Sequence, residues 1–564
     1  MRRLRLSSLF PVVTIFALLG PVGAGVVGAI LPAFGHLPAA GMQGPSTSAF
    51  FALFDLPGIG RSIWLSISTG FLATCLALVI TALILAGGHG TRVFALIRAL
   101  LSPLLSVPHA AVAFGLAFLI APSGWVVRVI SPWLTGWERP PDLLILNDPA
   151  GLSIVLALIV KEVPFLLLMS IAAVGQVDEP RSRQVFLALG YDKSIGWLKA
   201  VFPRIYRQIR LPVLVVLAYS MSVVDVALIL GPTTPPTLAV QIVRLMSNPD
   251  LSMRAVAAAG ALLQLGLVAG ALLVWWIGEM GVSACAARWT YLGGRGKRVA
   301  FIGGIGQFLG VVVAVVVIMG LFVLGVWSVA GYWGFPDAMP ESLSFRTWAR
   351  HGSSLGSATA ETALIALVST LLATVLTVGC LESEYRRGVR LGAGAIWILY
   401  MPLLIPQIAF LPGLQTFMIT VGADMGLAAV IAGHVVFVLP YVFLSLAAPW
   451  RAWDARLGTV AMALGADHCG ILWKVRLPML VGPVLTATAV GIAVSVGQYL
   501  PTLLIGGGRV ETLTTEAVAL ASGGDRRAIG VYALGQTVAA LLPFAVAIVV
   551  PRLLWRNRRG VLNG

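Results

Sequence analysis

Three charged side chains stand inside apolar runs that are long enough to cross a bilayer. Lys161 and Glu162 lie in one run, and Asp225 lies in the next. A charged side chain at the centre of a bilayer costs about 2.5–3.5 kcal/mol on insertion scales, so these groups should face protein or water rather than lipid. Two interpretations stay open. The charges form a polar gate or solute contact on a path through the membrane, or Lys161 forms an ion pair with Glu162 or Asp225.

Two polar loops interrupt the apolar sequence. The first polar loop covers residues 178–212, and the second polar loop covers residues 454–478. At a shift of 275 residues, the Ala-Leu-Gly of 188–190 coincides with that of 463–465, and Phe-Pro at 202–203 coincides with Leu-Pro at 477–478. Each loop therefore has the tripeptide Ala-Leu-Gly and, at the same distance after it in both loops, a proline preceded by a bulky apolar residue.

The repeat extends over most of the chain. Gly231, for example, recurs as Gly506 at the same shift. Because the two copies run in the same direction, we expect two parallel halves related by a pseudo-twofold axis along the membrane normal, with a path between them. Gln498 and Tyr499 lie near the repeat-equivalent of Asp225. They therefore join the charged residues as candidates for the path.

Three other polar residues are expected to have structural roles. His109 and Gln407 each follow a proline that recurs in the repeat. We expect both to pack at helix ends. His434 stands in an apolar run, where a hydrogen bond between helices is a more common role than metal binding.

The composition is that of an α-helical membrane protein. Of the 564 residues, 59% are hydrophobic and 11% are charged, and the mean hydropathy is +0.95. The net charge of +16 comes from short clusters beside apolar runs. That distribution is typical of membrane topology, not of a nucleic-acid-binding patch. The four cysteines lie far apart without metal-ligand spacing, which predicts neither a disulfide framework nor a metal site.

Apolar runs of about 20 residues predict twelve membrane spans. Boundaries read from sequence carry an error of a few residues. The expected spans are 9–31, 62–86, 99–121, 151–175, 211–231, 255–278, 300–330, 359–380, 394–420, 426–449, 480–506 and 530–554.

The basic residues predict the orientation of these spans. If the N-terminus is cytoplasmic, 27 of the 38 Lys and Arg residues lie on the inside and ten lie on the outside. This bias follows the positive-inside rule. It places both polar loops and both chain termini in the cytoplasm.

Each polar loop is expected to form a helix, a glycine stop and a second short helix. Residues 179–189 and 454–464 have an amphipathic pattern, and a glycine follows where a helix commonly ends. Such an elbow exposes apolar side chains that can dock in a groove of a partner. The alternative is that they lie on the membrane surface, but the repeated Gly-to-Pro spacing favours docking. The expected docking side chains are Phe186, Leu187, Met462 and Leu464.

This pattern resembles the EAA loop of ABC-importer permeases: Glu-Ala-Ala, three residues, Gly, nine residues, Ile, one residue and Leu-Pro. The Gly-to-Pro spacing is kept in both loops, whereas Gln184 and Thr459 replace the glutamate and only Ala461 keeps an alanine of the pair. The positions that carry the resemblance are Gln184, Ala188, Leu189, Gly190, Ala200, Phe202 and Pro203 in the first polar loop and Thr459, Ala461, Ala463, Leu464, Gly465, Val475, Leu477 and Pro478 in the second.

The resemblance implies a fold and a function. The chain is similar to fused permeases of ferric-iron and thiamine importers, and most similar to the thiamine type. It implies an all-α polytopic protein with two parallel six-helix repeats of the ABC type I importer permease fold, in the inner membrane. It further implies two copies of a cytoplasmic ABC ATPase and an external or periplasmic solute-binding protein as partners, with thiamine or ferric iron as candidate solute.

ATP chemistry is expected on another chain. The sequence contains no GxxxxGK[ST] motif for binding nucleotide phosphates. We therefore expect no cofactor on this chain, with ATP and Mg bound by the partner ATPase, and no enzymatic activity of its own.

The expected domain organisation follows the repeat. An N-terminal anchor helix and linker occupy 1–57, and the first permease domain occupies 58–280 with its coupling loop at 178–212. A basic segment, the seventh helix and an outside loop occupy 281–357. The second permease domain occupies 358–556, with its coupling loop at 454–478.

Two other classes of protein fit less well. An ion-coupled secondary transporter with two six-helix halves shares the span count and the parallel repeat. Its long cytoplasmic loop is expected between the sixth and seventh spans, whereas the long loops in this chain follow the fourth and tenth. A membrane-embedded enzyme would need a catalytic constellation, and the sequence has no HExxH motif.

Overall fold

The computed structural model describes residues 9–88, 90–296, 301–388 and 392–554. The two termini lie outside these ranges, and so do the basic residues Lys297, Arg298 and Arg390, which contribute to the predicted orientation. Within them the chain is almost wholly helical. Its one sheet is the antiparallel pair β1 (His36–Leu37) and β2 (Met42–Gln43), which encloses the 3-10 turn η1 (Pro38–Ala40).

The helices follow the two-half order of the sequence. The first half comprises α2 (Leu9–Ala33), α3 (Ser48–Phe54), α4 (Ile59–Gly88), α5 (Arg92–Ser106), α6 (His109–Ile120), α7 (Trp125–Ile130), α8 (Leu152–Val174), α9 (Glu179–Ala188), α10 (Lys193–Ala200), α11 (Phe202–Ser220), α12 (Asp225–Leu230), α13 (Leu238–Met246) and α14 (Met253–Tyr291).

The second half begins after the basic segment. It comprises α15 (Phe301–Val329), α16 (Arg346–Arg350), α17 (Gly352–Arg387), α18 (Ala393–Leu404), α19 (Gln407–Thr420), α20 (Leu427–Ala452), α21 (Ala455–Ala463), α22 (His468–Ile471), the π-helical turn η2 (Leu472–Arg476), α23 (Leu477–Met479), α24 (Val481–Val496), α25 (Leu500–Gly506), α26 (Leu513–Ala521) and α27 (Arg526–Leu554).

Nine helices in the described residues are long and apolar enough to cross a membrane, or eleven if two bent pairs each count as one span. The sequence predicted twelve. The difference is the predicted span 211–231, which the structure divides into α11 and α12 with a break between Ser220 and Asp225. The first turns of α11 also carry three arginines, so that this helix is less apolar than the others.

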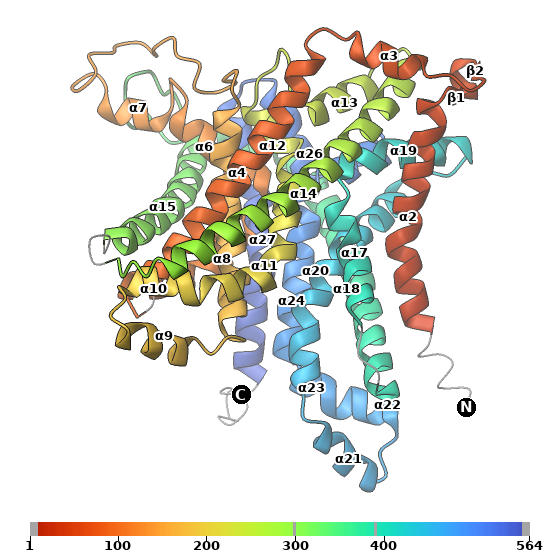
Figure 1. Cartoon of the computed structure of the whole chain (residues 1–564). Helices are drawn as coiled ribbons and strands as arrows, with labels where there is room; N and C mark the ends of the chain where they lie inside the picture. The colour runs from red at the N-terminus through yellow and green to blue at the C-terminus, as the bar shows by residue number, and fades with distance from the viewer. Residues whose placement is uncertain (1–8, 89, 297–300, 389–391, 555–564) are drawn as a thin grey trace.

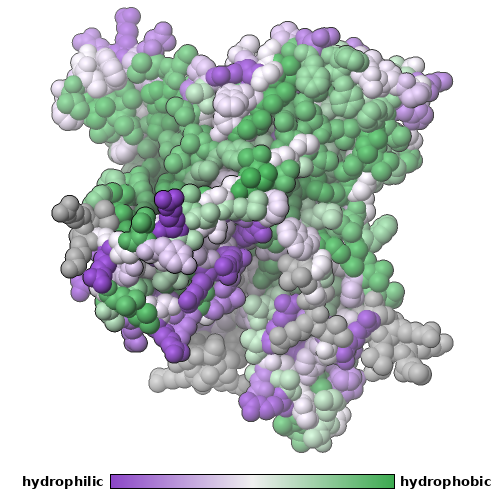
Figure 2. Space-filling model, in the orientation of Figure 1, coloured by the Kyte–Doolittle hydropathy of each residue, from purple (hydrophilic) through white to green (hydrophobic). Residues whose placement is uncertain are grey.

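The two polar loops lie at the same end of the molecule (Figure 1). The described start of α2 and the described end of α27 lie at that end too, whereas α3, α7, α13 and the β1–β2 hairpin lie at the opposite end. Apolar side chains dominate the middle of the face shown in Figure 2, and hydrophilic residues gather towards the two ends. This arrangement suits a protein with an apolar belt inside a bilayer.

Each half sends its leading helix across to the other half. The helix α2 packs against α17, α18 and α19, while α15 packs against α4, α5 and α6. Glycines allow these close contacts, because a Cβ at Gly28 would lie 2.1 Å from the carbonyl oxygen of Gly413. Such small-residue contacts are how membrane helices approach one another closely. The exchange ties the halves into one unit.

Candidate functional site

The two polar loops share one backbone design. In the first, Asp178 caps α9 and Gly190 ends it with φ of +79°; in the second, Asp454 caps α21 and Gly465 ends it with φ of +88°. This left-handed conformation is accessible to glycine without a steric penalty.

Both helix ends have the same pair of hydrogen bonds. Gly190 N donates to Leu187 O and Tyr191 N donates to Phe186 O, and the equivalent bonds recur at Gly465 and Ala466. This is the Schellman arrangement, which satisfies carbonyls that the end of a helix would leave unbonded. The glycine stop predicted from the sequence is therefore present in both loops.

The second helix of each elbow also begins at an aspartate. The Asp192 side chain accepts hydrogen bonds at the start of α10, and the Asp467 side chain accepts one at the start of α22. The elbows then diverge. The helix α10 is regular, and Pro203 opens α11 directly. The second loop continues through η2 and α23, and a bend of 77° separates it from α24. Pro478 thus opens a three-residue helix instead of the long span.

The first polar loop is packed against the body of the protein by apolar contacts. Phe186 is only 5% exposed and belongs to a cluster with Trp197, Val201 and residues of α4. Its ring lies so close to α10 that a Cβ added at Gly196 would come within 2.2 Å of it. The amphipathic pattern of residues 179–189 predicted that Phe186 is an exposed docking residue. That expectation is wrong, because the ring fills the inside of the elbow.

The segment between the halves also holds the first polar loop. Lys199 Nζ donates to the carbonyl oxygens of Trp289 and Gly294, each at 3.0 Å, and lies 4.6 Å from the centre of the Trp289 ring. The backbone nitrogen of Asp192 donates to the carbonyl oxygen of Arg295 at 2.9 Å. Partial burial lowers the pKa of Lys199. The first polar loop is therefore tied to the end of α14 and to the residues that follow it.

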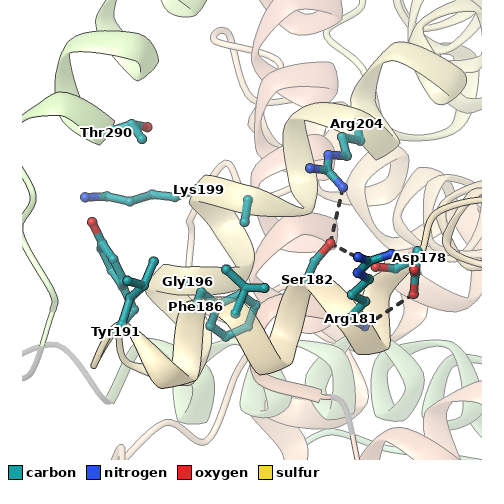
Figure 3. Close-up of a pocket in the computed structure, with 12 residues that line it drawn as sticks. Asp178, Arg181, Ser182, Phe186, Tyr191, Gly196, Lys199, Arg204 and Thr290 are labelled. Carbon is teal, nitrogen blue, oxygen red and sulfur yellow. Dashed lines mark hydrogen bonds between the residues drawn. The ribbon is translucent and has the colours of Figure 1, made fainter.

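An open groove of about 540 Å³ lies between α9, α10 and the end of α14 (Figure 3). Exposed apolar side chains, Val185 and Leu189, line it. Its basic lining residues are Arg181, Lys199 and Arg204. The Arg204 guanidinium donates to Ser182 Oγ at 3.2 Å. The groove therefore combines an apolar floor with positive charge.

The second polar loop is held by a buried arginine. Arg476 is 1% exposed, and its Nη1 donates to Glu382 Oε2 on α17. The guanidinium lies 3.6 Å from the centre of the Tyr385 ring and 4.2 Å from that of Trp453. Cation–π contacts of this kind gain strength when the cation is desolvated. No comparable ion pair was predicted from the sequence.

Beyond this anchor, the second polar loop projects away from the helices (Figure 1). Leu464 at its tip is 83% exposed, and Val460, Met462 and Trp473 are also exposed. Leu187 and Leu189 have exposed positions in the first loop. Both elbows thus present apolar side chains to solvent, as predicted for Leu187, Met462 and Leu464.

The residues that carry the EAA resemblance lie on these elbows. Gln184 and Thr459, at the glutamate position, are both exposed. The other exposed positions are Ala188, Leu189, Gly190, Pro203, Ala463, Leu464, Gly465 and Pro478, while Ala200, Phe202, Ala461, Val475 and Leu477 are half-buried.

Interrupted helices meet between the two halves. The breaks are α5/α6, α11/α12, α18/α19 and α24/α25, and each break in the first half has a repeat-related break in the second. The bend between α18 and α19 is 87°. Gln407 Nε2 at the start of α19 donates to Gln498 Oε1 at the α24/α25 break, at 3.1 Å. Discontinuous helices at such a position expose backbone and polar groups to a central site.

Lys161 faces one of these breaks. Its Nζ donates to the carbonyl oxygens of Leu104, Leu105 and Val107, at the end of α5. A lysine in this position satisfies carbonyls that the helix end leaves free and interacts favourably with the helix dipole. The proposed ion pair with Glu162 or Asp225 is not the arrangement found, because no hydrogen bond among the described residues joins Lys161 to either carboxylate.

Glu162 and Asp225 face a group of aromatic side chains. Glu162 Oε1 lies 3.5 Å from His109 Nε2, and the His109 ring lies 4.9 Å from the Tyr219 ring. Asp225 is within Coulombic range of His109, Tyr219 and Tyr499. The structure therefore brings together Glu162, Asp225 and Tyr499, with Gln498 next to Tyr499 in the chain and Lys161 within Coulombic range of Glu162. It also shows that His109 contacts a carboxylate as well as packing at a helix end.

The roles of several residues at these sites were not predicted from the sequence. Glu382 and Arg476 lie 94 positions apart, and Tyr441 of α20 reaches the central cluster from the second half. The only sequence signal for Glu382 and Arg476 is that each is a charged residue at the end of an apolar run. His434 bonds Ser495 and Thr502, as expected for a residue between helices. Among the described residues, no group of three His, Cys, Asp or Glu side chains could hold a metal ion.

The fold and these loops define a class of protein: a polytopic permease with two repeated halves and two paired loops at one end. Comparisons with known proteins give the same result. The chain is 30% identical over 514 residues to the inner membrane ABC transporter permease protein YnjC of Escherichia coli, which covers 90% of this chain and 92% of that relative. No protein-family model matches the chain. The chain belongs to the family of ABC transporter permeases.

Two further relatives match part of the chain. The spermidine/putrescine transport system permease protein PotC of Haemophilus influenzae is 26% identical over 196 residues, which cover 34% of this chain and 74% of that protein. The molybdenum transport system permease protein ModB of Mycobacterium bovis is 27% identical over 224 residues, which cover 36% of this chain and 85% of that protein. Each match has the size of one permease half, which agrees with a fused two-half chain.

Proposed function

We propose that this chain is the translocation subunit of an ATP-driven importer and that its two polar loops transmit movement from a separate ATPase. The observation that carries the proposal is the duplicated elbow, in which a capped helix ends at Gly190 or Gly465 in the same Schellman arrangement. Both elbows lie at one end of the molecule and expose apolar side chains. A pair of equivalent loops suits two copies of one ATPase subunit on the cytoplasmic side. In this orientation the chain termini are also in the cytoplasm.

The two docking surfaces are not equal. The first polar loop offers the groove beside α9 and α10, and the second offers a projecting tip around Leu464. Because Gln184 and Thr459 are exposed and uncharged, the contact at the glutamate position of the motif would not depend on a carboxylate. Apolar contacts and the basic lining of the groove would then make up the interface.

The solute is expected to arrive on an external binding protein and to pass between the halves. Thiamine and ferric iron remain candidates, and the names of the partial relatives add polyamines and molybdenum as the cargo of similar permeases. Glu162, Asp225, Gln498 and Tyr499 are proposed to line the path. Lys161 is proposed to position the α5/α6 break at its edge, because its ammonium group bonds to backbone carbonyls.

A pull-down from detergent tests the coupling role. Replacement of both Gly190 and Gly465 by valine puts β-branched residues at φ near +80°, which should distort both elbows. An ATPase subunit should co-purify with the unmodified chain and not with the double variant. The matched control is Gly266→Val on α14, where an added Cβ meets no atom within 4 Å. A folded chain that brings down no ATPase and transports solute on an ion gradient would instead be a secondary transporter.

A further inference from the structure

The junction of interrupted helices between the halves holds more negative charge than the described side chains neutralise. Asp225 is 8% exposed, and no ion pair within the described residues involves its carboxylate. Its hydrogen bonds are to backbone at the start of its own helix, including Val226 N. A buried carboxylate without a paired cation is costly unless another charge approaches it.

The second carboxylate does not change this balance. Glu162 is 5% exposed, and its described ionic partner is His109, which carries a positive charge only when it is protonated. Lys161, the next residue along α8, donates its hydrogen bonds to the carbonyl oxygens at the end of α5, and its charge lies within Coulombic range of Glu162. Two buried carboxylates therefore face one junction with a single lysine beside Glu162, opposite a histidine and several tyrosines.

Aromatic side chains from both halves surround these carboxylates. Tyr219 and Tyr499 lie within Coulombic range of Asp225, and Tyr219 and Tyr441 lie within Coulombic range of Glu162. The three tyrosines are half-buried, and the His109 side chain is 30% exposed, so the protein does not fully cover the junction. The faces of tyrosine rings attract cations, most strongly where water is excluded.

We propose that this junction is a binding site within the membrane for a small organic cation, a solute with a positively charged nitrogen and an apolar or aromatic body. The proposal rests on the permease function proposed above and narrows its solute class. Asp225 and Glu162 would neutralise the cation, and the tyrosine faces would contact its body. An oxyanion would meet two carboxylates at close range, which disfavours it as cargo for this chain.

Direct binding to the purified full-length chain in detergent tests this site. The probes are thiamine, spermidine and sodium molybdate, each titrated at constant ionic strength while the Tm and the intrinsic tyrosine and tryptophan fluorescence are recorded. Thiamine or spermidine should raise the Tm and change the fluorescence, and molybdate should do neither. Asp225→Asn should weaken binding of the organic cation by about tenfold or more, a change of at least 1.4 kcal/mol.

Two controls separate the site from a general charge effect. Asp424→Asn removes a carboxylate whose side chain is 81% exposed, at the outer end of the molecule, and should leave cation binding unchanged. Asp225→Glu keeps the charge and should recover much of the binding. Equal binding by the parent chain and Asp225→Asn would overturn the proposal, and so would failure of both cations to bind or a response to molybdate alone.

ATPase co-purification is measured on the same samples. This measurement separates failure of the binding site from failure of the proposed function. If the ATPase co-purifies and no organic cation binds, the chain is a permease without this site. If Asp225→Asn lowers ATPase co-purification as well, the variant has lost its fold, and Asp225→Glu then decides the outcome. In that variant, the absence of cation binding together with normal co-purification would again overturn the site.

Discussion

The first and second polar loops have the same elbow but different anchors. In the first, Phe186 and Trp197 are buried against α4 and α11, and Lys199 ties the loop to the end of α14. In the second, one buried arginine, Arg476, joins the loop to Glu382, and the tip projects beyond the helices. Repeat-related sequences can therefore keep a docking geometry while the means of attachment diverges.

The difference follows from single positions of the repeat. Arg476 is the equivalent of Val201, at the shift of 275 residues, and Val201 is fully buried in the apolar cluster of the first loop. Lys199 corresponds to Lys474, which is exposed. An apolar anchor restrains a loop over a broad area, whereas an ion pair restrains it at one point and with directional bonds. We therefore expect the two loops to respond differently to matched substitutions.

The largest effect is expected at Arg476. Arg476→Ala removes one of the two arginines paired with the buried Glu382 carboxylate, so that Arg386 remains at 2.8 Å from Oε1. It also opens a space among Tyr385, Trp450 and Trp453. Removal of the sole partner of a buried charge costs about 3–5 kcal/mol. Because Glu382 keeps Arg386, we expect a loss near the lower end of that range. The Tm in detergent should fall, and limited proteolysis should cut the second polar loop much faster while the first stays protected.

A double variant shows whether the charge pair causes this effect. Arg476→Met with Glu382→Gln removes both charges and keeps similar side-chain volumes. It should recover part of the lost stability, because the buried negative charge that Arg476 had neutralised is removed together with Arg476, although Arg386 then also loses its ion pair with Glu382. Equal sensitivity of both loops in the single variant would show that they do not have separate anchors.

A smaller effect is expected at Gly196 of the first polar loop. Gly196→Ala places a Cβ within 2.2 Å of the Phe186 ring, and overpacking of this kind costs about 1–3 kcal/mol. The comparison substitution is Gly470→Ala in the second loop, one position before the repeat-equivalent of Gly196, where the nearest atom is Asp467 Oδ1 at 3.0 Å. Proteolysis of the first loop should increase in Gly196→Ala only. If Gly470→Ala has the larger effect, the first elbow is not the tightly packed one.

The sequence was sufficient for most of the membrane helices and for both glycine stops, because those depend on local pattern and backbone conformation, but not for the break that divides the predicted span 211–231. It was not sufficient for the anchors. The sequence pattern of α9 places Phe186 among the exposed residues. The ring is buried because Gly196 of α10 packs closely against it, and that contact is not visible in the sequence. Lys161 likewise seemed available to Glu162, the next residue, whereas its partners are carbonyls more than 50 positions away. Contacts between distant segments decide these roles, and a single sequence does not specify them.

The smallest effect is expected at the lysine pair. Lys199→Met removes two hydrogen bonds to backbone carbonyls and the contact with the Trp289 ring, while the apolar stem remains. Cation–π contacts at exposed sites contribute about 0.5–1 kcal/mol, so the Tm should change little. Hydrogen exchange should nevertheless rise at the end of α14, because the first polar loop no longer holds residues 289–294. Lys474→Met should leave exchange unchanged throughout, since Lys474 is exposed at the equivalent position. A rise in both variants would mean that loss of positive charge alone loosens this end of the molecule, and the proposed difference between the two anchors would then rest on Arg476 and Phe186.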